Sequence, residues 1–311
     1  MENISIKKDD FEKLFGETLS DHVKNKIAEY DLRYALVTEK EREIALIKIM
    51  EMLLNPLLTY AGPHRLKQWE KGWEENLAEF KDTKKTDDIS PHYFGKYEIN
   101  RLNGNFIKAV SPNYERNMVY VILDYVFDKY LRNYDNIYEF GCGTGHMLIK
   151  VREVNPTANL FGLDWATSSQ KILKQLTETG ILNKTTSYHF DFFHPDHKIK
   201  FAKNSAVYTV MALEQVGTKY KKFLSYLLKN KPEICIHVEP MEEFLDEDKL
   251  LDNLSITYEK KRNYLHGFLN YLRQLESEGK IQIHEAKRSN IGSFFVENSS
   301  IVVWSPKKYE K

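Results

Sequence analysis

Apolar side chains recur at helical spacing through residues 1–80, and no alternating strand pattern interrupts them. One apolar stripe spans residues 11–27 and a second spans residues 44–58. Pro56 should kink or end the second helix, because proline removes a backbone donor. We therefore expect residues 1–115 to form an N-terminal helical region that caps the rest of the chain.

Three large aromatic side chains, Trp69, Trp73 and Phe80, would share one face of a third helix in this region. Periodic aromatic residues of this kind most often pack in a core, and we interpret them as packing residues. The stretch 91–105 that follows mixes aromatic and polar side chains without a period, which is typical of segments that line sites. Its composition alone suggests that it folds over a site as a lid, with Tyr93, Tyr97 and Arg101 as the candidate contacts.

From residue 116 onward, short apolar strands alternate with helical segments, the pattern of a mostly parallel sheet covered by helices on both faces. A helix is predicted over about 257–278, ended by Gly279, inside a helical insertion at about 241–279. The fold class is therefore α/β, with a seven-stranded Rossmann-like sheet over residues 116–311. We expect its strands at 136–140, 159–163, 186–190, 206–211, 233–238, 281–286 and 299–304.

The first of these strands, in Asn136-Ile-Tyr-Glu-Phe-Gly-Cys-Gly-Thr-Gly145, runs into a turn with three alternate glycines. Glycine permits positive φ and lets backbone amides approach a ligand closely. The dinucleotide pattern G-x-G-x-x-G would need a sixth-position glycine where His146 stands. This spacing disfavours a nicotinamide-dependent dehydrogenase.

Acidic residues end the next two strands as well. Asp164, followed by Trp165, ends the second strand, and the pair Asp191 and Phe192 ends the third. A carboxylate at the end of the second strand is placed to accept hydrogen bonds from both hydroxyls of a ribose. Together with Glu139 before the glycines, this order resembles class I S-adenosylmethionine (SAM)-dependent methyltransferases over residues 116–311, most closely over 136–215.

The resemblance implies SAM as the cofactor, with Trp165 packed on the adenine and Glu139 under the methionine amino group. It also implies that Asp191 and Phe192 contact the adenine amino group and ring edge. The implied cofactor-binding set is Glu139, Gly141, Cys142, Gly143, Gly145, Asp164, Trp165, Asp191, Phe192 and Met211.

Methyl transfer from a sulfonium is an in-line displacement, so positioning in a sheltered pocket can supply most of the rate. A hydroxyl acceptor would also use a general base from the ends of the fourth and fifth strands, which offer Glu214, His237 and Glu239. His237 and Glu239 share a face of the fifth strand, and Glu239, nearer the loop, is the favoured base. His237 is also open to interpretation as a buried histidine satisfied by a neighbour, and Glu214 as a group that holds the acceptor.

Charge and motif content narrow the acceptor. Forty-five basic residues balance forty-five acidic ones, which argues against a nucleic-acid substrate. The Asn/Asp-Pro-Pro-Tyr/Phe motif of base and glutamine N-methyltransferases is replaced by Met211-Ala-Leu-Glu214. We therefore expect O-methylation of a small polar molecule, such as a sugar or a biosynthetic intermediate. A small-molecule N-methyltransferase and a non-catalytic SAM-binding protein are the alternatives.

The two cysteines, Cys142 and Cys235, fall in or beside predicted buried strands and lack metal-ligand spacing, so no disulfide and no metal site are expected. No apolar run is long enough to span a bilayer, and the first residues lack the apolar centre of a secretory signal. A cytoplasmic location is the resulting expectation.

Overall fold

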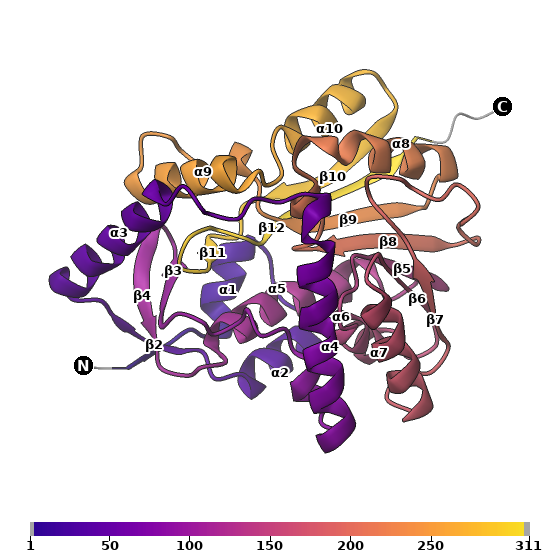
Figure 1. The fold of residues 1–311 in the computed structure, drawn as a ribbon, viewed down its shortest axis with the longest axis horizontal. Coiled ribbons are helices and arrows are strands. Elements are labelled where there is room, and N and C mark those ends of the chain that lie inside the picture. Colours follow the sequence, from indigo (N-terminus) through magenta and orange to yellow (C-terminus); the bar gives the residue numbers. More distant parts are fainter. Residues whose placement is uncertain (1–2, 308–311) are drawn as a thin grey trace.

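A seven-stranded sheet forms the centre of the molecule in this computed structural model, which describes residues 3–307 (Figure 1). Four neighbouring pairs in it are parallel, and only the strand β12 runs antiparallel to both of its neighbours. The predicted mostly parallel α/β sheet is therefore confirmed. Its strands, in the order in which they lie side by side, are β10 (Ile281–Lys287), β12 (Ser300–Pro306), β9 (Ile234–Glu239), β8 (Ser205–Val210), β5 (Asn136–Phe140), β6 (Asn159–Asp164) and β7 (Thr185–His189).

Helices cover both faces of this sheet, as its apolar strands require. One apolar core joins the sheet to α5 (Tyr114–Tyr130), α6 (His146–Val154) and α7 (Thr167–Glu178). The other joins it to α8 (Lys221–Asn230) and α10 (Phe268–Ser277). The period of two decides which strand residue enters which core. Ile236 and Val238 of β9 enter the first, and Cys235 enters the second.

The direction of chain connection reverses beside β5. From β5 the chain goes to β6 and then β7 on one side, and afterwards returns to β8 on the other side. In open α/β sheets, the carboxyl ends of the strands at such a reversal border the crevice where ligands bind. The glycine turn directly follows β5 and so lies at that crevice.

The N-terminal region is helical only in part. Short strands form a small antiparallel sheet, to which the C-terminal part of the chain contributes one strand. The predicted helices are present, but the strands were missed, because strands of two to five residues that pair with distant segments leave too short an alternating pattern. The helices are α1 (Lys8–Phe15), α2 (Asp21–Glu29), α3 (Glu39–Leu54) and α4 (Leu66–Thr83), and the strands are β1 (Ile4–Ser5), β2 (Arg33–Leu36), β3 (Ile99–Leu102), β4 (Asn105–Ala109) and β11 (Ile291–Gly292).

The insertion before β10 contains two helices where one was predicted. The helix α9 (Leu250–Arg262) ends at Asn263, whose φ is 52°, and α10 begins after Gly267, whose φ is 70°. Left-handed conformations end a helix, and Asn and Gly are the residues that adopt them most readily. The predicted apolar stripe is still buried, because Leu265 packs with the residues of α10 although it lies in the break.

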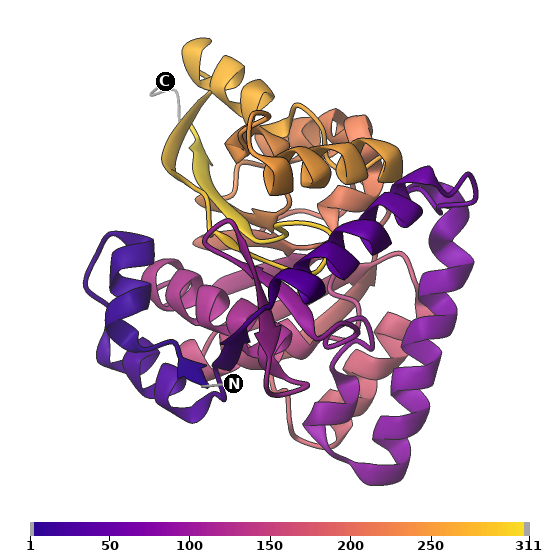
Figure 2. The ribbon, with the colours of Figure 1, turned by 90° about the vertical axis from the view of Figure 1, so that its left-hand side faces the viewer.

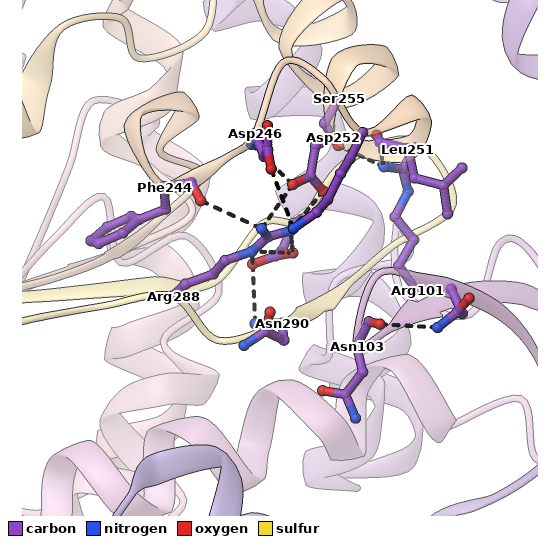
Figure 3. Close-up of polar contacts among 12 residues, drawn as sticks. Arg101, Asn103, Phe244, Asp246, Leu251, Asp252, Ser255, Arg288 and Asn290 are labelled. Atoms are coloured by element: carbon purple, nitrogen blue, oxygen red, sulfur yellow. Dashed lines mark hydrogen bonds and ion pairs between the residues drawn. The ribbon is translucent and has the colours of Figure 1, made fainter.

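Arg101, expected near the mouth of a site, is instead a buried connector (Figure 3). Its Nη1 donates to the carbonyl oxygen of Leu251 at 2.6 Å and to the hydroxyl of Ser255 at 2.7 Å. Close by, Arg288 donates to both carboxylate oxygens of Asp252, at 2.7 and 2.8 Å. These bonds fasten α9 to β3 and to the segment after β10. Figure 2 shows α9 above the small sheet accordingly.

Within residues 3–307, no helix is both long enough and apolar enough to cross a membrane.

Candidate active site

A cavity of about 750 Å³, counting its open mouth, lies at the carboxyl ends of β5, β6, β7 and β8. Apart from Gly145, every residue of the predicted cofactor set lines it. The sheet thus brings together side chains that are up to 72 positions apart in the sequence (211 − 139). The lining members of the set are Glu139, Gly141, Cys142, Gly143, Asp164, Trp165, Asp191, Phe192 and Met211.

The glycine turn is shaped by protein packing as much as by access for a ligand. Gly141 has φ 75°, and a Cβ atom there would lie 2.3 Å from the Cβ of Ala212 in the loop after β8. Gly145 has φ 77°, and its Cβ would lie 2.4 Å from Leu173 of α7. Both positions require glycine for conformation and for space. Gly145 therefore serves the packing of α7, away from the cavity wall.

The carboxylate of Asp164 holds the turn and the start of α7 in place. Its Oδ2 accepts from the backbone N–H of Gly143 at 2.9 Å, and its Oδ1 accepts from that of Ala166 at 2.8 Å. Burial raises the pKa of this carboxyl to about 6. An ionised carboxylate can accept about four hydrogen bonds, so two further ones are available to a ligand in the cavity.

The other two strand-end acids are anchored in a similar way. Glu139 accepts a hydrogen bond from the hydroxyl of Tyr208 at 2.9 Å, and burial raises its pKa well above the usual value. Asp191 accepts from the backbone N–H of Phe193 at 2.8 Å and lies 2.9 Å from a ring nitrogen of His194. All three carboxylates are thus held by the fold at the cavity wall.

The helix α4 lies across this edge of the sheet beside α7, as Figures 1 and 2 both show. Its Trp69 and Trp73 line the cavity, so only Phe80 of the three predicted packing residues lies wholly in the core. Glu70 docks the helix, because its carboxylate accepts from the backbone N–H of Thr167 at 2.7 Å and of Ser168 at 2.8 Å at the start of α7. Helical periodicity cannot distinguish a helix that packs on a core from one that covers a cavity.

Two buried polar atoms on the cavity wall lack a hydrogen-bond partner among residues 3–307: Nε2 of His146 and Nε1 of Trp69. The Nδ1 of His146 lies 3.0 Å from the hydroxyl of Thr144, and burial lowers the pKa of the imidazole to about 3, so the ring is neutral. Buried polar atoms normally have partners. These two are therefore candidates to bind a polar ligand, and the sequence pointed to neither for that role.

Glu239, the favoured base, does not line the cavity. It is fully buried, and its carboxylate accepts from the backbone N–H groups of Ala212, Leu213 and Glu214 at 3.2, 3.1 and 3.3 Å. Burial raises its pKa to about 7. This geometry favours a structural role for Glu239, that of holding the turn after β8.

His237 lies farther from the cavity, on the face of the sheet that α10 covers. Its Nδ1 is 2.9 Å from the hydroxyl of Thr209, and its ring packs against Phe268 and Trp304. Burial lowers its pKa to about 3. The arrangement favours the interpretation of a buried histidine held by a neighbour at Nδ1, while its buried Nε2 has no hydrogen-bond partner within residues 3–307.

Glu214 does not line the cavity either, but its carboxylate is bonded to a side chain that does. Gln215, which lines the cavity, donates from Nε2 to the carboxylate of Glu214 at 2.7 Å, and Arg65 donates to Oε1 of Gln215, also at 2.7 Å. Burial, with the charge of Glu239 as the second cause, raises the pKa of Glu214 to about 8. Tyr93, predicted as a lid residue, lines the cavity as well.

No group of three or more His, Cys, Asp or Glu side chains among the described residues could hold a metal ion.

No protein-family model matches the sequence, and no curated protein matches it. Several solved structures are similar in part. Magnesium protoporphyrin IX methyltransferase from Synechocystis PCC 6803 with bound S-adenosylhomocysteine (SAH) has 17% identity and a TM-score of 0.46, over 63% of this chain and 84% of that one. An O-methyltransferase from neocarzinostatin biosynthesis has 13% sequence identity and a TM-score of 0.44, and the match covers 78% of this chain and 70% of that one. The N-methyltransferase NodS from Bradyrhizobium japonicum WM9 has 11% sequence identity and a TM-score of 0.42, and the match covers 62% of this chain and 88% of that one. These likenesses are too distant to assign an activity.

Proposed function

We propose that this chain is a SAM-dependent methyltransferase that transfers a methyl group to a hydroxyl of a small polar molecule. The observation that carries the proposal is the cavity where the connection of the strands reverses. Three acidic side chains from three successive parallel strands surround a glycine turn there. An acid for a sugar diol, an acid for an ammonium group and aromatic side chains for a purine are what a sulfonium nucleoside requires.

In this proposal Asp164 binds the ribose hydroxyls with the lone pairs that the backbone leaves free. Asp191 and Phe192 lie at the end of β7 and would contact the adenine, with Trp165 against its face. Glu139 would bind the methionine ammonium group, a cation that offsets the cost of a buried carboxylate. When bound, SAM supplies the electrophilic methyl group.

The acceptor would enter from the β8 side of the cavity. The adenosine-binding acids are at β6 and β7, and β8 lies on the opposite side of β5 from those strands. Tyr93, Trp69 and Gln215 line the cavity, and Glu214 stands directly behind Gln215. Because α4 covers the cavity, a small acceptor fits the proposal better than a macromolecule.

Glu214 is the proposed general base for a hydroxyl acceptor. A base is most effective when its pKa lies near the working pH, and the pKa of Glu214, at about 8, meets that condition. Glu239 and His237 would then support the fold around it.

The test is incubation of the protein with methyl-labelled SAM and fractions of a small-molecule metabolite extract. We expect label in a small molecule, in an ether or ester that survives brief treatment at neutral pH. Label on nitrogen would change the acceptor atom but keep the activity. Absence of labelled product with every fraction, together with tight binding of SAM, would instead indicate a non-catalytic SAM-binding protein.

A further inference from the structure

Arg65 is a buried cation whose hydrogen-bond partners are neutral. It stands at the end of the short helix η1 (Pro63–Arg65), and 6% of its surface is exposed. Besides its bond to Gln215, its Nε donates to Oε1 of Gln68 at 3.2 Å, and its guanidinium lies 4.9 Å from the ring centroid of Trp69. In the described part of the chain it has no carboxylate within 4.0 Å.

Arg262, at the end of α9, is half-buried, and its hydrogen-bond partner is likewise neutral. Its Nη2 donates to the hydroxyl of Tyr264 at 3.0 Å, and its guanidinium lies 5.1 and 5.8 Å from the ring centroids of Tyr264 and Tyr258. Its Nε is buried and has no partner, and no carboxylate of residues 3–307 lies within 4.0 Å of it.

The fold brings together the two segments that carry these arginines. The backbone N–H of Ala61 donates to the carbonyl oxygen of Arg262 at 2.6 Å, and Asn263 donates from its side chain to the carbonyl oxygen of Ala61 at 3.1 Å. These bonds fasten the connection between α3 and α4 to the end of α9. Figure 2 shows the two segments side by side. Burial lowers the pKa of Arg65, and the charge of Arg262 is the second cause.

Glu214 does not supply the missing counterion. It lies more than 4.0 Å from both guanidinium groups, and its raised pKa leaves much of it uncharged near neutral pH. A buried and a half-buried cation of like charge, neither paired with an anion, are unfavourable for the protein alone. An anionic ligand group would relieve that cost.

We propose that Arg65 and Arg262 together bind a carboxylate of the methyl acceptor, so that the acceptor is a hydroxy acid. The inference rests on the proposed function and narrows its substrate class. A carboxylate is flat and matches the planar fork of a guanidinium, which can donate two parallel hydrogen bonds to it. Trp69, Tyr258 and Tyr264 flank the pair and offer an apolar surface to the body of the acceptor.

The test uses the full chain saturated with SAH and titrated by calorimetry with sodium benzoate, benzamide and inorganic phosphate. We expect benzoate to bind at least about tenfold more tightly than benzamide, as charge-assisted bonds imply. Comparable binding of benzoate and benzamide, binding of phosphate alone, or no binding of any probe would overturn the inference.

Arginine variants complete the test. Arg65→Met and Arg262→Met should each weaken benzoate binding about tenfold or more and leave SAH binding within about twofold of the wild type. Arg33→Met is the matched control, because Arg33 is an exposed arginine paired with Asp31 on the small sheet. Failure of the wild type to bind SAH contradicts the proposed function itself. Retained SAH binding with unchanged benzoate affinity in both variants contradicts only the carboxylate assignment.

Discussion

At the scale of single residues, hydrogen bonds divide the strand-end carboxylates into two groups. Asp164 lines the cavity and has lone pairs beyond its two backbone bonds, whereas Glu239 is fully buried under three backbone N–H groups. Glu214, in the 3-10 helix Leu213–Tyr220 that follows β8, has one side-chain donor and no backbone donor within residues 3–307. Glu239 and Glu214 are therefore held differently, Glu239 by the backbone of the turn and Glu214 by the side chain of Gln215.

Substitution of Glu214 and Glu239 should separate these roles. Glu214→Gln should lower turnover by about 10²-fold or more, the usual contribution of a general base, and leave thermal stability unchanged or raised. It should also abolish the rise of kcat/KM with an apparent pKa near 8 that the wild type should show. Glu239→Gln should instead destabilise the protein by about 1 to 3 kcal/mol, because it weakens acceptance from three buried donors. Steady-state kinetics across pH and thermal unfolding measure both, and the reverse assignment of effects would contradict our interpretation.

The position of the cavity acids was predictable from the sequence. Each acid follows a predicted parallel strand, and the carboxyl ends of parallel strands meet at the same edge of the sheet. The choice among Glu214, His237 and Glu239 was not predictable. It depends on donors such as the N–H groups of Ala212 and Leu213, which only the folded turn brings to one carboxylate.

At the scale of elements, α4 is the part that turns an open crevice into a cavity. Its Trp73 lies against the glycine turn, since a Cβ atom on Gly143 would be 3.0 Å from the indole ring. Glu70, one turn before Trp73, caps α7. The helix was predictable from its periodicity, but its position over the site was not. Asn263 and Gly267 indicate the break between α9 and α10, because both residues readily end a helix. The break was missed because the apolar stripe continues across it.

Removal of the cap should loosen this cover. Glu70→Ala deletes two bonds to the start of α7 and should cost about 0.5 to 2 kcal/mol of stability, as loss of a helix cap does. It should also speed SAH dissociation severalfold, because α4 must move for the ligand to leave. Glu74→Ala is the control. Glu74 lies one turn farther along α4, is exposed, and makes a 3.9 Å ion pair with the exposed Lys171. Stopped-flow tryptophan fluorescence follows dissociation, and equal rates in the two variants would count against a covering role for α4.

At the scale of the whole molecule, buried ionisable groups should set the dependence of stability on pH. Burial raises the pKa of Glu115 and Glu239 to about 7 and that of Glu214 to about 8. Each of these carboxyls binds its proton more tightly in the folded state, so stability falls as pH rises from about 4.5 to the folded pKa. His146 and His237, with pKa values lowered to about 3, act oppositely and reduce stability as pH falls below 6.5.

The ligand-free protein should therefore be most stable between about pH 4.5 and 6.5. Between pH 6.5 and 8.5 it should lose roughly 2 to 4 kcal/mol, since each unit of pKa shift corresponds to 1.36 kcal/mol. Glu214→Gln should reduce that alkaline loss. Urea unfolding at several pH values measures the free energy of unfolding of both proteins and so tests both expectations. Stability that rises steadily from pH 6 to 8.5 would contradict the burial of these carboxyls.

The parallel sheet could be predicted because its central strands, such as β8 and β9, are buried and largely apolar and alternate with helical segments along the chain. The small sheet could not, because its pairings join residues far apart, such as Ile291 with Leu102, through strands too short to show a period. The division of the chain near residue 115 remains a prediction.

The central claim is that the cavity at the end of β5 binds a sulfonium nucleoside through Asp164. Calorimetric titration of the folded protein with SAM, SAH and NAD tests it most directly, with Asp164→Ala as the variant and the exposed Asp82→Asn as the control. We predict binding of SAM and SAH but not NAD, weakened by about 1 to 3 kcal/mol in Asp164→Ala and unchanged in Asp82→Asn. Absence of heat with both SAM and SAH, or equal affinity in Asp164→Ala, would contradict the claim.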